Sequence, residues 1–275
     1  MKATVNTYRQ SEPAPPRRAM VIAAHPDDIE FVVAGTVAKW IRAGAQARYV
    51  LVTSGDAGSH RTGVTREEVA RVREAEQRAA ALVVGVDEVI FLGYPDGEVE
   101  PTLELRRDLV REIRRFKPDT VICFDPTRLL VGDGYINHPD HRAVGQAALD
   151  AVMPAAAMPL VFAELGKEGL EPHRVKEVLI ASGPEPDTWV DISDTIELKL
   201  EALRQHVSQF PDGWGPVERT RERAAQIGAQ VGVPYAEVFR RIVLVREERT
   251  DRERPGSVAT GGGGCDEPYP THHKT

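Results

Sequence analysis

The sequence predicts a three-layer α/β fold, Rossmann-like, in which helices cover both faces of a mostly parallel sheet. Short apolar runs rich in β-branched residues alternate with longer segments of helical periodicity between Ala19 and Phe124. Helix-stop signals follow these segments at Gly44, at Gly85 and at Lys117-Pro118. Strands that alternate with helices of this length form a parallel sheet between two helical layers.

The first half of the chain is the more regular. Its expected strands cover residues 19–24, 48–53, 88–92 and 120–124, and its expected helices cover about residues 34–43, 66–84 and 103–116. In the second half we expect a helix from Pro139 to about residue 152, strands near 175–181 and 188–191, a helix capped by Ser193 or Asp194 that runs to about residue 206, a helix near 217–228, and a last strand at 239–245.

Length and composition predict one domain. The chain has 275 residues, of which 41% are hydrophobic, enough for a sizeable core. We expect a single α/β domain over residues 18–247. The proline-bearing residues 1–17 should form a flexible arm, and the charged, then glycine-rich residues 248–275 a disordered tail.

Charge and cysteine usage narrow the class of partner. The net charge is −7 and basic residues are interleaved with acids, so the basic face that nucleic acid or an anionic membrane requires is not expected. We find no secretory signal and no apolar window of membrane-spanning length. Cys123 in an apolar strand and Cys265 in the tail are not expected to pair. We therefore expect a cytoplasmic protein with a small-molecule partner, and a homo-oligomer remains open.

The segment after the first expected strand carries the first chemical signal. Ligands of open α/β sheets bind at the carboxyl ends of the strands, where a dinucleotide-binding fold would place glycines. This chain has His25-Pro26-Asp27-Asp28-Ile29-Glu30 there. Imidazole and carboxylate groups offer lone pairs to a cation, so the residue types indicate a metal and not a nucleotide.

A second cluster, His138-Pro139-Asp140-His141, follows the expected strand at 120–124. Hydrolytic zinc sites need three protein ligands and an open position, and His25, Asp28 and His141 would supply two imidazoles and one carboxylate. Asp28 or Asp140 alone would equally fit a helix N-cap, and a lone histidine would fit a surface position. The two clusters at two strand ends together favour a metal site.

These motifs resemble those of the PIG-L/LmbE-like deacetylases. The resemblance rests on Ala24-His25-Pro26-Asp27-Asp28 with Glu30, and on His138-Pro139-Asp140-His141. Weaker matches are Thr53–Gly58, Arg73-Glu74 and Phe91–Gly97, and the whole covers about residues 19–210. The resemblance implies a zinc-dependent N-deacetylase in which His25, Asp28 and His141 bind the metal and Asp27 is the general base. Iron(II) also suits such ligands.

Four further residues are candidates for catalysis or substrate binding. His138 lies one helical turn before His141 and, if protonated, would stabilise the oxyanion, with Asp140 as the orienting partner that favours its imidazolium form. Asp140 could equally be only a helix-start carboxylate. Arg73 and Asp96 are candidates for contacts with substrate hydroxyls. A surface salt bridge for Arg73 and turn chemistry for Asp96-Gly97 are the alternatives.

The expected reaction is hydrolysis of an N-acyl group, above all acetyl, from an amino sugar or a glucosaminyl conjugate. One alternative is an amidase that cleaves the larger amide of a thiol conjugate of a glucosaminyl-inositol. A second, of another class, is a metal- or sugar-binding protein without turnover, although a pure binder needs neither Asp27 nor His138. A third is metal-dependent phosphoester hydrolysis, which favours two metals and more carboxylates.

Overall fold

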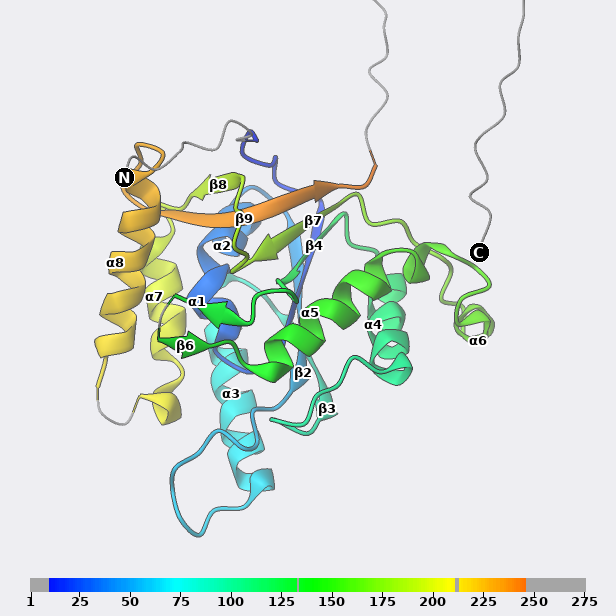
Figure 1. Cartoon of the computed structure of the whole chain (residues 1–275), viewed down its shortest axis with the longest axis horizontal. Helices are drawn as coiled ribbons and strands as arrows, with labels where there is room; N and C mark the ends of the chain where they lie inside the picture. Colours follow the sequence, from blue (N-terminus) through cyan, green and yellow to red (C-terminus); the bar gives the residue numbers. More distant parts are fainter. Residues whose placement is uncertain (1–9, 133, 211–212, 246–275) are drawn as a thin grey trace, which may run out of the picture. The chain divides into compact units, whose positions relative to one another are not determined.

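The computed structural model describes residues 10–132, 134–210 and 213–245, and the described chain builds a seven-stranded sheet between two helical layers (Figure 1). The strand order is β3-β2-β1-β4-β7-β9-β8. The strands are β1 (Arg18–Ala23), β2 (Gln46–Thr53), β3 (Glu88–Tyr94), β4 (Thr120–Phe124), β7 (Glu177–Ala181), β8 (Thr188–Asp191) and β9 (Ala236–Val243). The predicted three-layer α/β class is confirmed.

The sheet is parallel from β3 to β7, and β9 runs antiparallel to both β7 and β8. The chain leaves β1 towards β2 and β3 on one side, and β4 then returns to pair with the other side of β1. The strand order therefore reverses between β1 and β4. A crevice forms at such a switch point, outside the carboxyl ends of the strands, so the loops after β1 and β4 face the same space.

The helices divide between the two faces of the sheet. One apolar core joins the sheet to α1 (Asp28–Val32), α2 (Ala34–Arg42), α3 (Arg66–Val84), α7 (Ile196–Arg204) and α8 (Gly215–Ala229). The core on the other face joins it to α4 (Leu103–Phe116), α5 (Pro139–Val152), the 3-10 turn η1 (Ala155–Ala157) and α6 (Ala163–Lys167). Trp40, on α2, is fully buried in the first core, and Cys123, on β4, in the second.

Several boundaries follow directly from local signals. Helix α3 begins after Thr65, whose side chain accepts from the Glu68 N–H while Glu68 accepts from the Thr65 N–H, a capping box. It ends at Gly85, which adopts a left-handed conformation (φ 91°) that a side chain would disfavour. The predicted bounds of α3, α4, α5, β4 and β8 agree with the structure.

Other boundaries differ from prediction. Helix α7 begins at Ile196 after Thr195, so neither Ser193 nor Asp194 caps it; Ser193 instead donates to Asp191. Strand β9 begins three residues before the expected start at Phe239. The structure adds α1, the turn η2 (Val207–Gln209) and a two-stranded hairpin of β5 (Leu130–Val131) and β6 (Tyr135–Ile136), none of which was predicted.

The described residues up to Val245 belong to one compact unit. Residues 10–17 of the expected arm are described, and Gln10 donates to the Asp187 carboxylate (3.0 Å) and to the Arg241 carbonyl (3.1 Å). The rest of that arm and the expected tail, with Cys265, lie outside the described residues. No helix in the described ranges has both the length and the apolar character needed to cross a membrane.

Candidate metal centre

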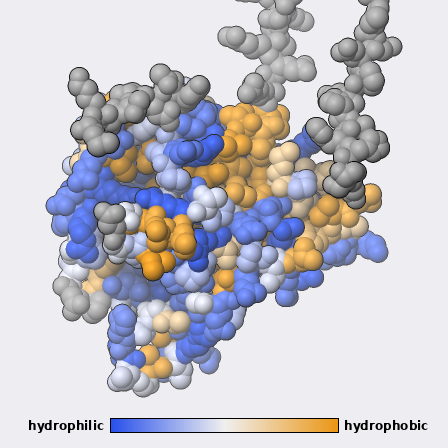
Figure 2. All heavy atoms as spheres, viewed as in Figure 1, coloured by the Kyte–Doolittle hydropathy of each residue, from blue (hydrophilic) through white to orange (hydrophobic). Residues whose placement is uncertain are grey.

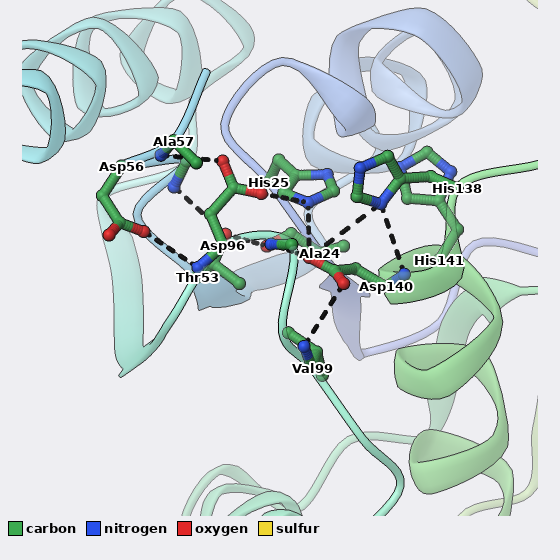
Figure 3. Close-up of polar contacts among 12 residues, drawn as sticks. Ala24, His25, Thr53, Asp56, Ala57, Asp96, Val99, His138, Asp140 and His141 are labelled. Carbon is green, nitrogen blue, oxygen red and sulfur yellow. Dashed lines mark hydrogen bonds and ion pairs between the residues drawn. The ribbon is translucent and has the colours of Figure 1, made fainter. Parts of the chain in front are cut away.

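The two His-Pro-Asp motifs meet at the carboxyl ends of β1 and β4 (Figure 3). Asp28 lies between the two predicted histidine ligands, 3.4 Å from His25 Nδ1 through Oδ2 and 3.0 Å from His141 Nε2 through Oδ1. One donor atom from each of these three residues lies within 4.8 Å of the others. His25 and Asp28 are buried, and His141 is partly exposed and stacks on the Phe124 ring (4.6 Å).

The opposite nitrogen of His25 faces two further carboxylates. His25 Nε2 lies 3.1 Å from Asp96 Oδ1 and 3.0 Å from Asp140 Oδ2 (Figure 3). His138 completes a second group of possible ligands with His25, Asp96 and Asp140. A carboxylate on the second nitrogen of a metal-binding histidine fixes the ring orientation and raises its basicity.

The electrostatics of the cluster suit a cation. Burial lowers the pKa of His25, but hydrogen bonds with Asp140, Asp28 and Asp96 outweigh burial and raise it to about 12. Burial opposes ionisation of Asp28 as well, yet His141 and His25 hold the pKa of this carboxyl well below its usual range. Three ionised carboxylates around one ring leave an excess of negative charge. Two imidazoles and a carboxylate that converge in such surroundings fit a divalent metal ion.

Asp27 is held in an unusual backbone conformation. Its φ of 92° lies in the left-handed region, which is uncommon for a residue with a side chain and is found most often at functional sites. The Asp27 N–H donates to Gln77 Oε1 (3.0 Å), and Gln77 Nε2 donates to Glu30 Oε1 (3.0 Å). Glu30 Oε2 lies 3.1 Å from His206 Nε2, and Glu30, Gln77 and His206 are fully buried. A buried polar chain thus supports Asp27, which lies between Pro26 and Asp28.

Arg73 also supports this loop. Its guanidinium donates to the carbonyls of Pro26 (2.6 Å) and Gly55 (3.0 Å) and lies 3.4 Å from Asp27 Oδ2. A Cβ at Gly55 or Gly58 would collide with the guanidinium, so both glycines make room for it. Burial raises the pKa of Asp27 to about 6, an effect that Arg73 opposes. Arg73 is buried, so the surface salt bridge considered as its alternative role is not what the structure shows.

The acidic residues take partners that the sequence did not indicate. Asp140 is fully buried, accepts from the Gly97 N–H (2.8 Å) and binds His25, while its Oδ2 is 3.9 Å from His138 Nδ1. The expected pairing of Asp140 with His138 is thus the weaker of its contacts. Asp96 accepts from the Ala57 N–H (3.1 Å) as well as facing His25, so it is more than a turn residue.

His138 is placed as a hydrogen-bond donor. Its Nδ1 accepts from the Asp140 N–H (3.3 Å), so the neutral ring carries its hydrogen on Nε2. Burial and the neighbouring His25 lower the pKa of His138. The structure therefore favours a neutral ring where the sequence analysis considered an imidazolium.

The hairpin between Asp125 and His138 adds an apolar surface beside the site. Leu129, Leu130, Tyr135 and Ile136 are each at least half exposed. Figure 2 shows this apolar patch among more hydrophilic surroundings. Strands of two residues carry too little periodicity to be recognised in a sequence, which is why the hairpin was not predicted.

Gln77, Glu30 and His206 are the supporting residues whose role sequence reasoning missed. Gln77 lies four residues after Arg73 on α3, so both occupy the same helix face. A glutamine on the buried face of an amphipathic helix is a detectable signal. His206 is fully buried against Glu30.

Comparisons with known proteins place the chain among deacetylase-like sequences. The profile of the PIG-L family, described as GlcNAc-PI de-N-acetylase, matches residues 20–152. The chain is 34% identical over 228 residues to diacetylchitobiose deacetylase of Thermococcus kodakarensis, with 82% of each protein covered. It is 31% identical to a probable N-acetyl-alpha-D-glucosaminyl L-malate deacetylase 2 of Bacillus anthracis, with 70% of this chain and 82% of the relative covered.

Solved structures extend the likeness. The N,N'-diacetylchitobiose deacetylase from Pyrococcus horikoshii, complexed with an inhibitor, matches with a TM-score of 0.76 at 32% identity over 86% of this chain and 88% of that chain. GalB, the 4-carboxy-2-hydroxymuconate hydratase of Pseudomonas putida, shares the fold with a TM-score of 0.69 at 22% identity, over 85% of this chain and 99% of that one. Because proteins named for different reactions share this fold, function has to be argued from the site.

Proposed function

Because the chain belongs to the PIG-L (GlcNAc-PI de-N-acetylase) family, we propose that it is a metal-dependent amide hydrolase that removes an N-acetyl group from an amino sugar or a glucosaminyl conjugate. The observation that carries the proposal is the convergence of His25, Asp28 and His141 next to the carboxylate of Asp27. Two relatives above 30% identity are named as deacetylases of acetylated glucosamine compounds.

We propose His25, Asp28 and His141 as the metal ligands and zinc as the metal, with iron(II) as the alternative that the same ligands accept. A divalent ion held there would polarise the acyl carbonyl and lower the pKa of a bound water molecule to about 7. Asp140 and Asp96 would hold the His25 ring in place through Nε2. We propose a cytoplasmic setting as well, which the buried thiol of Cys123, with its raised pKa, accommodates without a disulfide.

Asp27 is proposed as the general base. It takes a proton from the attacking water as the water oxygen bonds to the acyl carbon, and it returns a proton to the amine nitrogen as the carbon–nitrogen bond breaks. A pKa raised to about 6 by burial lets the same carboxyl accept and release a proton near neutrality. The side chain keeps 17% of its surface exposed, so it can reach substrate.

His138 is proposed to stabilise the oxyanion of the tetrahedral intermediate. Its neutral ring would donate from Nε2, because Nδ1 already accepts from the Asp140 N–H. Arg73 is proposed to act through the loop that it binds, and Asp96 through His25. We also propose that Arg73 or Asp96 contacts a substrate hydroxyl, which a ligand-bound structure would test.

The test measures acetate and free amine from N-acetylglucosamine and N,N'-diacetylchitobiose, and free amine with the thiol-bearing acid from a thiol-conjugate amide of glucosaminyl-inositol. Chelator-treated protein is assayed before and after addition of Zn²⁺ or Fe²⁺. We expect metal-restored release of acetate from at least one N-acetyl sugar. Release only from the bulky amide would support the amidase alternative, and binding without any release would support the non-catalytic one.

A further inference from the structure

Asp27 and Asp28, the proposed base and one proposed ligand, lie at the start of a helix that is too short to hold its own position. Helix α1 has five residues, and its N-cap Asp27 makes no side-chain cap hydrogen bond. Isolated helices shorter than about 12 residues are marginal in water, so contacts with the rest of the fold must place this one. Gln77 holds its amino-terminal end through the Asp27 N–H (3.0 Å). The carboxyl-terminal end needs a support of its own.

A buried ion pair lies at that end of α1. Lys199 on α7 and Glu237 on β9 are 2% and 3% exposed, and Lys199 Nζ lies 2.6 Å from Glu237 Oε1. Lys199 Nζ also donates to the carbonyl of Phe31 in α1 (3.0 Å). Glu237 accepts from the N–H groups of Gly35 (3.0 Å) and Thr36 (2.8 Å), in the first turn of α2. The pair therefore binds both helices at the junction where α1 ends and α2 begins.

The ion pair takes over backbone groups that a continuous helix would join. In an unbroken α-helix the Gly35 N–H would donate to the Phe31 carbonyl, four residues before it. Here the Gly35 N–H donates to Glu237, and the Phe31 carbonyl accepts from Lys199. Val33, between them, has φ −143° and ψ −7°, which is not a helical conformation. Because a side chain inserted into the backbone ladder bends a helix, the pair sets the angle between α1 and α2.

The charges of the pair match the two helix ends. The Lys199 cation lies at the carbonyl end of α1 and the Glu237 carboxylate at the N–H end of α2, as the helix dipoles favour. A Cβ at Gly35 would lie 3.1 Å from Glu237 Oε1 and 2.8 Å from Ile192 Cδ1, so glycine lets the carboxylate approach. Replacing a buried ion pair by apolar residues of similar volume is often neutral for stability. Stability alone therefore does not explain this pair, whereas the orientation that it imposes on α1 does.

We propose that Lys199 and Glu237 are positioning residues of the active site: by fixing the junction of α1 and α2, they aim Asp28 at the metal position and Asp27 beside it. Phe31 lies three residues after Asp28, less than one helical turn, so a shift at the junction moves the ligand as well. This inference rests on the proposed function for the roles of Asp27 and Asp28. It adds to the site two residues from the second half of the chain.

The experiment removes the pair without leaving one charge buried alone. The double variant Lys199→Met/Glu237→Gln is compared with the wild type for zinc affinity, by competition with a chelator, and for kcat and KM on an N-acetyl sugar that the wild type hydrolyses. Circular dichroism establishes that each protein is folded at the temperature of the assay. We expect zinc affinity to weaken about tenfold and kcat to fall about tenfold with KM unchanged, because ligand and base are displaced.

Glu177→Gln/Arg241→Met is the matched control. Arg241 lies on the same strand as Glu237, and its Nη2 is 2.6 Å from Glu177 Oε2. Glu177 begins β7, so this ion pair lies at the amino ends of the parallel strands, away from the site. The control should keep the zinc affinity and kcat of the wild type even where its Tm falls.

The wild-type zinc affinity in Lys199→Met/Glu237→Gln, or an equal loss of affinity in the control, overturns the positioning role. If the double variant does not fold, Gly35→Ala decides, because its Cβ displaces Glu237 without removing a charge; unchanged zinc affinity there overturns the role too. A wild type that binds zinc but releases no acetate refutes the proposed function, while weaker zinc binding in the double variant still upholds the positioning of Asp28. A wild type that binds no zinc refutes the ligand assignment and this inference with it.

Discussion

Two motifs of nearly the same sequence, His25-Pro26-Asp27-Asp28 and His138-Pro139-Asp140-His141, build opposite sides of the site with different backbones. In the first, the helix begins at the fourth residue and the third, Asp27, is the N-cap. In the second, the helix begins at the proline and the first residue, His138, is the N-cap. Relative to the motif, the helix thus begins two residues earlier in the second motif than in the first, although the two sequences are similar.

The shift gives the two third-position aspartates different surroundings. Asp27 lies in a left-handed conformation beside Arg73, and its side chain is partly exposed. Asp140 lies in the first turn of α5, fully buried, and accepts from the Gly97 N–H while it holds His25. The role of the carboxylate in a His-Pro-Asp sequence therefore depends on where the following helix begins.

The largest expected effect comes from the residue that links the motifs. Asp28 contacts both His25 and His141, so Asp28→Ala should remove bound metal and, with it, all measurable deacetylation. Metal content measured by mass spectrometry and acetate release check this. His173→Gln is the control, because His173 binds the Pro118 carbonyl away from the site and its loss should leave the metal stoichiometry unchanged. Full metal content in Asp28→Ala would refute the ligand assignment.

The next effect separates chemistry from metal binding. Asp27→Asn keeps the shape of the side chain but removes the proton acceptor, so kcat should fall by about 10²–10⁴ while the metal stays bound. Steady-state kinetics with metal analysis of the same sample measure both quantities. Wild-type kcat in this variant would mean that another group takes the proton.

A smaller loss of activity is expected when the hydrogen bond that holds the first motif in place is removed. Gln77→Ala removes the acceptor of the Asp27 N–H and frees the left-handed backbone, so the carboxylate becomes misplaced. We expect kcat to fall by about 10- to 10²-fold with KM and metal content unchanged. Gln226→Ala, on the surface of α8, is the matched control. A rise in KM without a change in kcat would contradict a positioning role.

The smallest effect is one of stability and pH. Burial lowers the pKa of His206, but Glu30 outweighs burial and raises it above 6.5. A group whose pKa is higher in the folded state than in the unfolded state stabilises the fold. This stabilisation is complete below the unfolded-state pKa and is lost as the pH rises through the folded-state pKa. Wild-type Tm should therefore fall as pH rises above 6.5, and His206→Gln should fall less over the same range. Parallel slopes in thermal melts would exclude a charged His206–Glu30 pair.

Much of the fold could be predicted because its signals are local. The capping box of Thr65 and Glu68 and the left-handed Gly85 define α3 within the sequence itself. Helix α1 has five residues and no side-chain cap, and β5 and β6 have two residues each, so their periodicity is too short to detect. The antiparallel direction of β9 depends on its pairing with β7, and no local sequence signal predicts that pairing.

The site divides in the same way. The convergence of His25, Asp28 and His141 could be predicted because strand ends in an open α/β sheet lie at one edge, which brings the two motifs together. The partner of Asp140 could not be predicted, because the imidazole that it contacts, His25, is 115 residues away in the sequence. His138 lies two residues from Asp140, and proximity in sequence suggested the wrong preference. Contacts between loops follow from packing, which the residue pattern does not encode.

The most direct test of the division of labour between the two motifs is the metal affinity of Asp27→Asn and Asp140→Asn, measured by competition with a zinc chelator. The Asp140 carboxylate contacts Nε2 of the proposed ligand His25, so Asp140→Asn should weaken metal binding by about 10- to 100-fold. Asp27→Asn should bind the metal as the wild type does. Equal affinities in the two variants, or weaker binding in Asp27→Asn, would contradict the account.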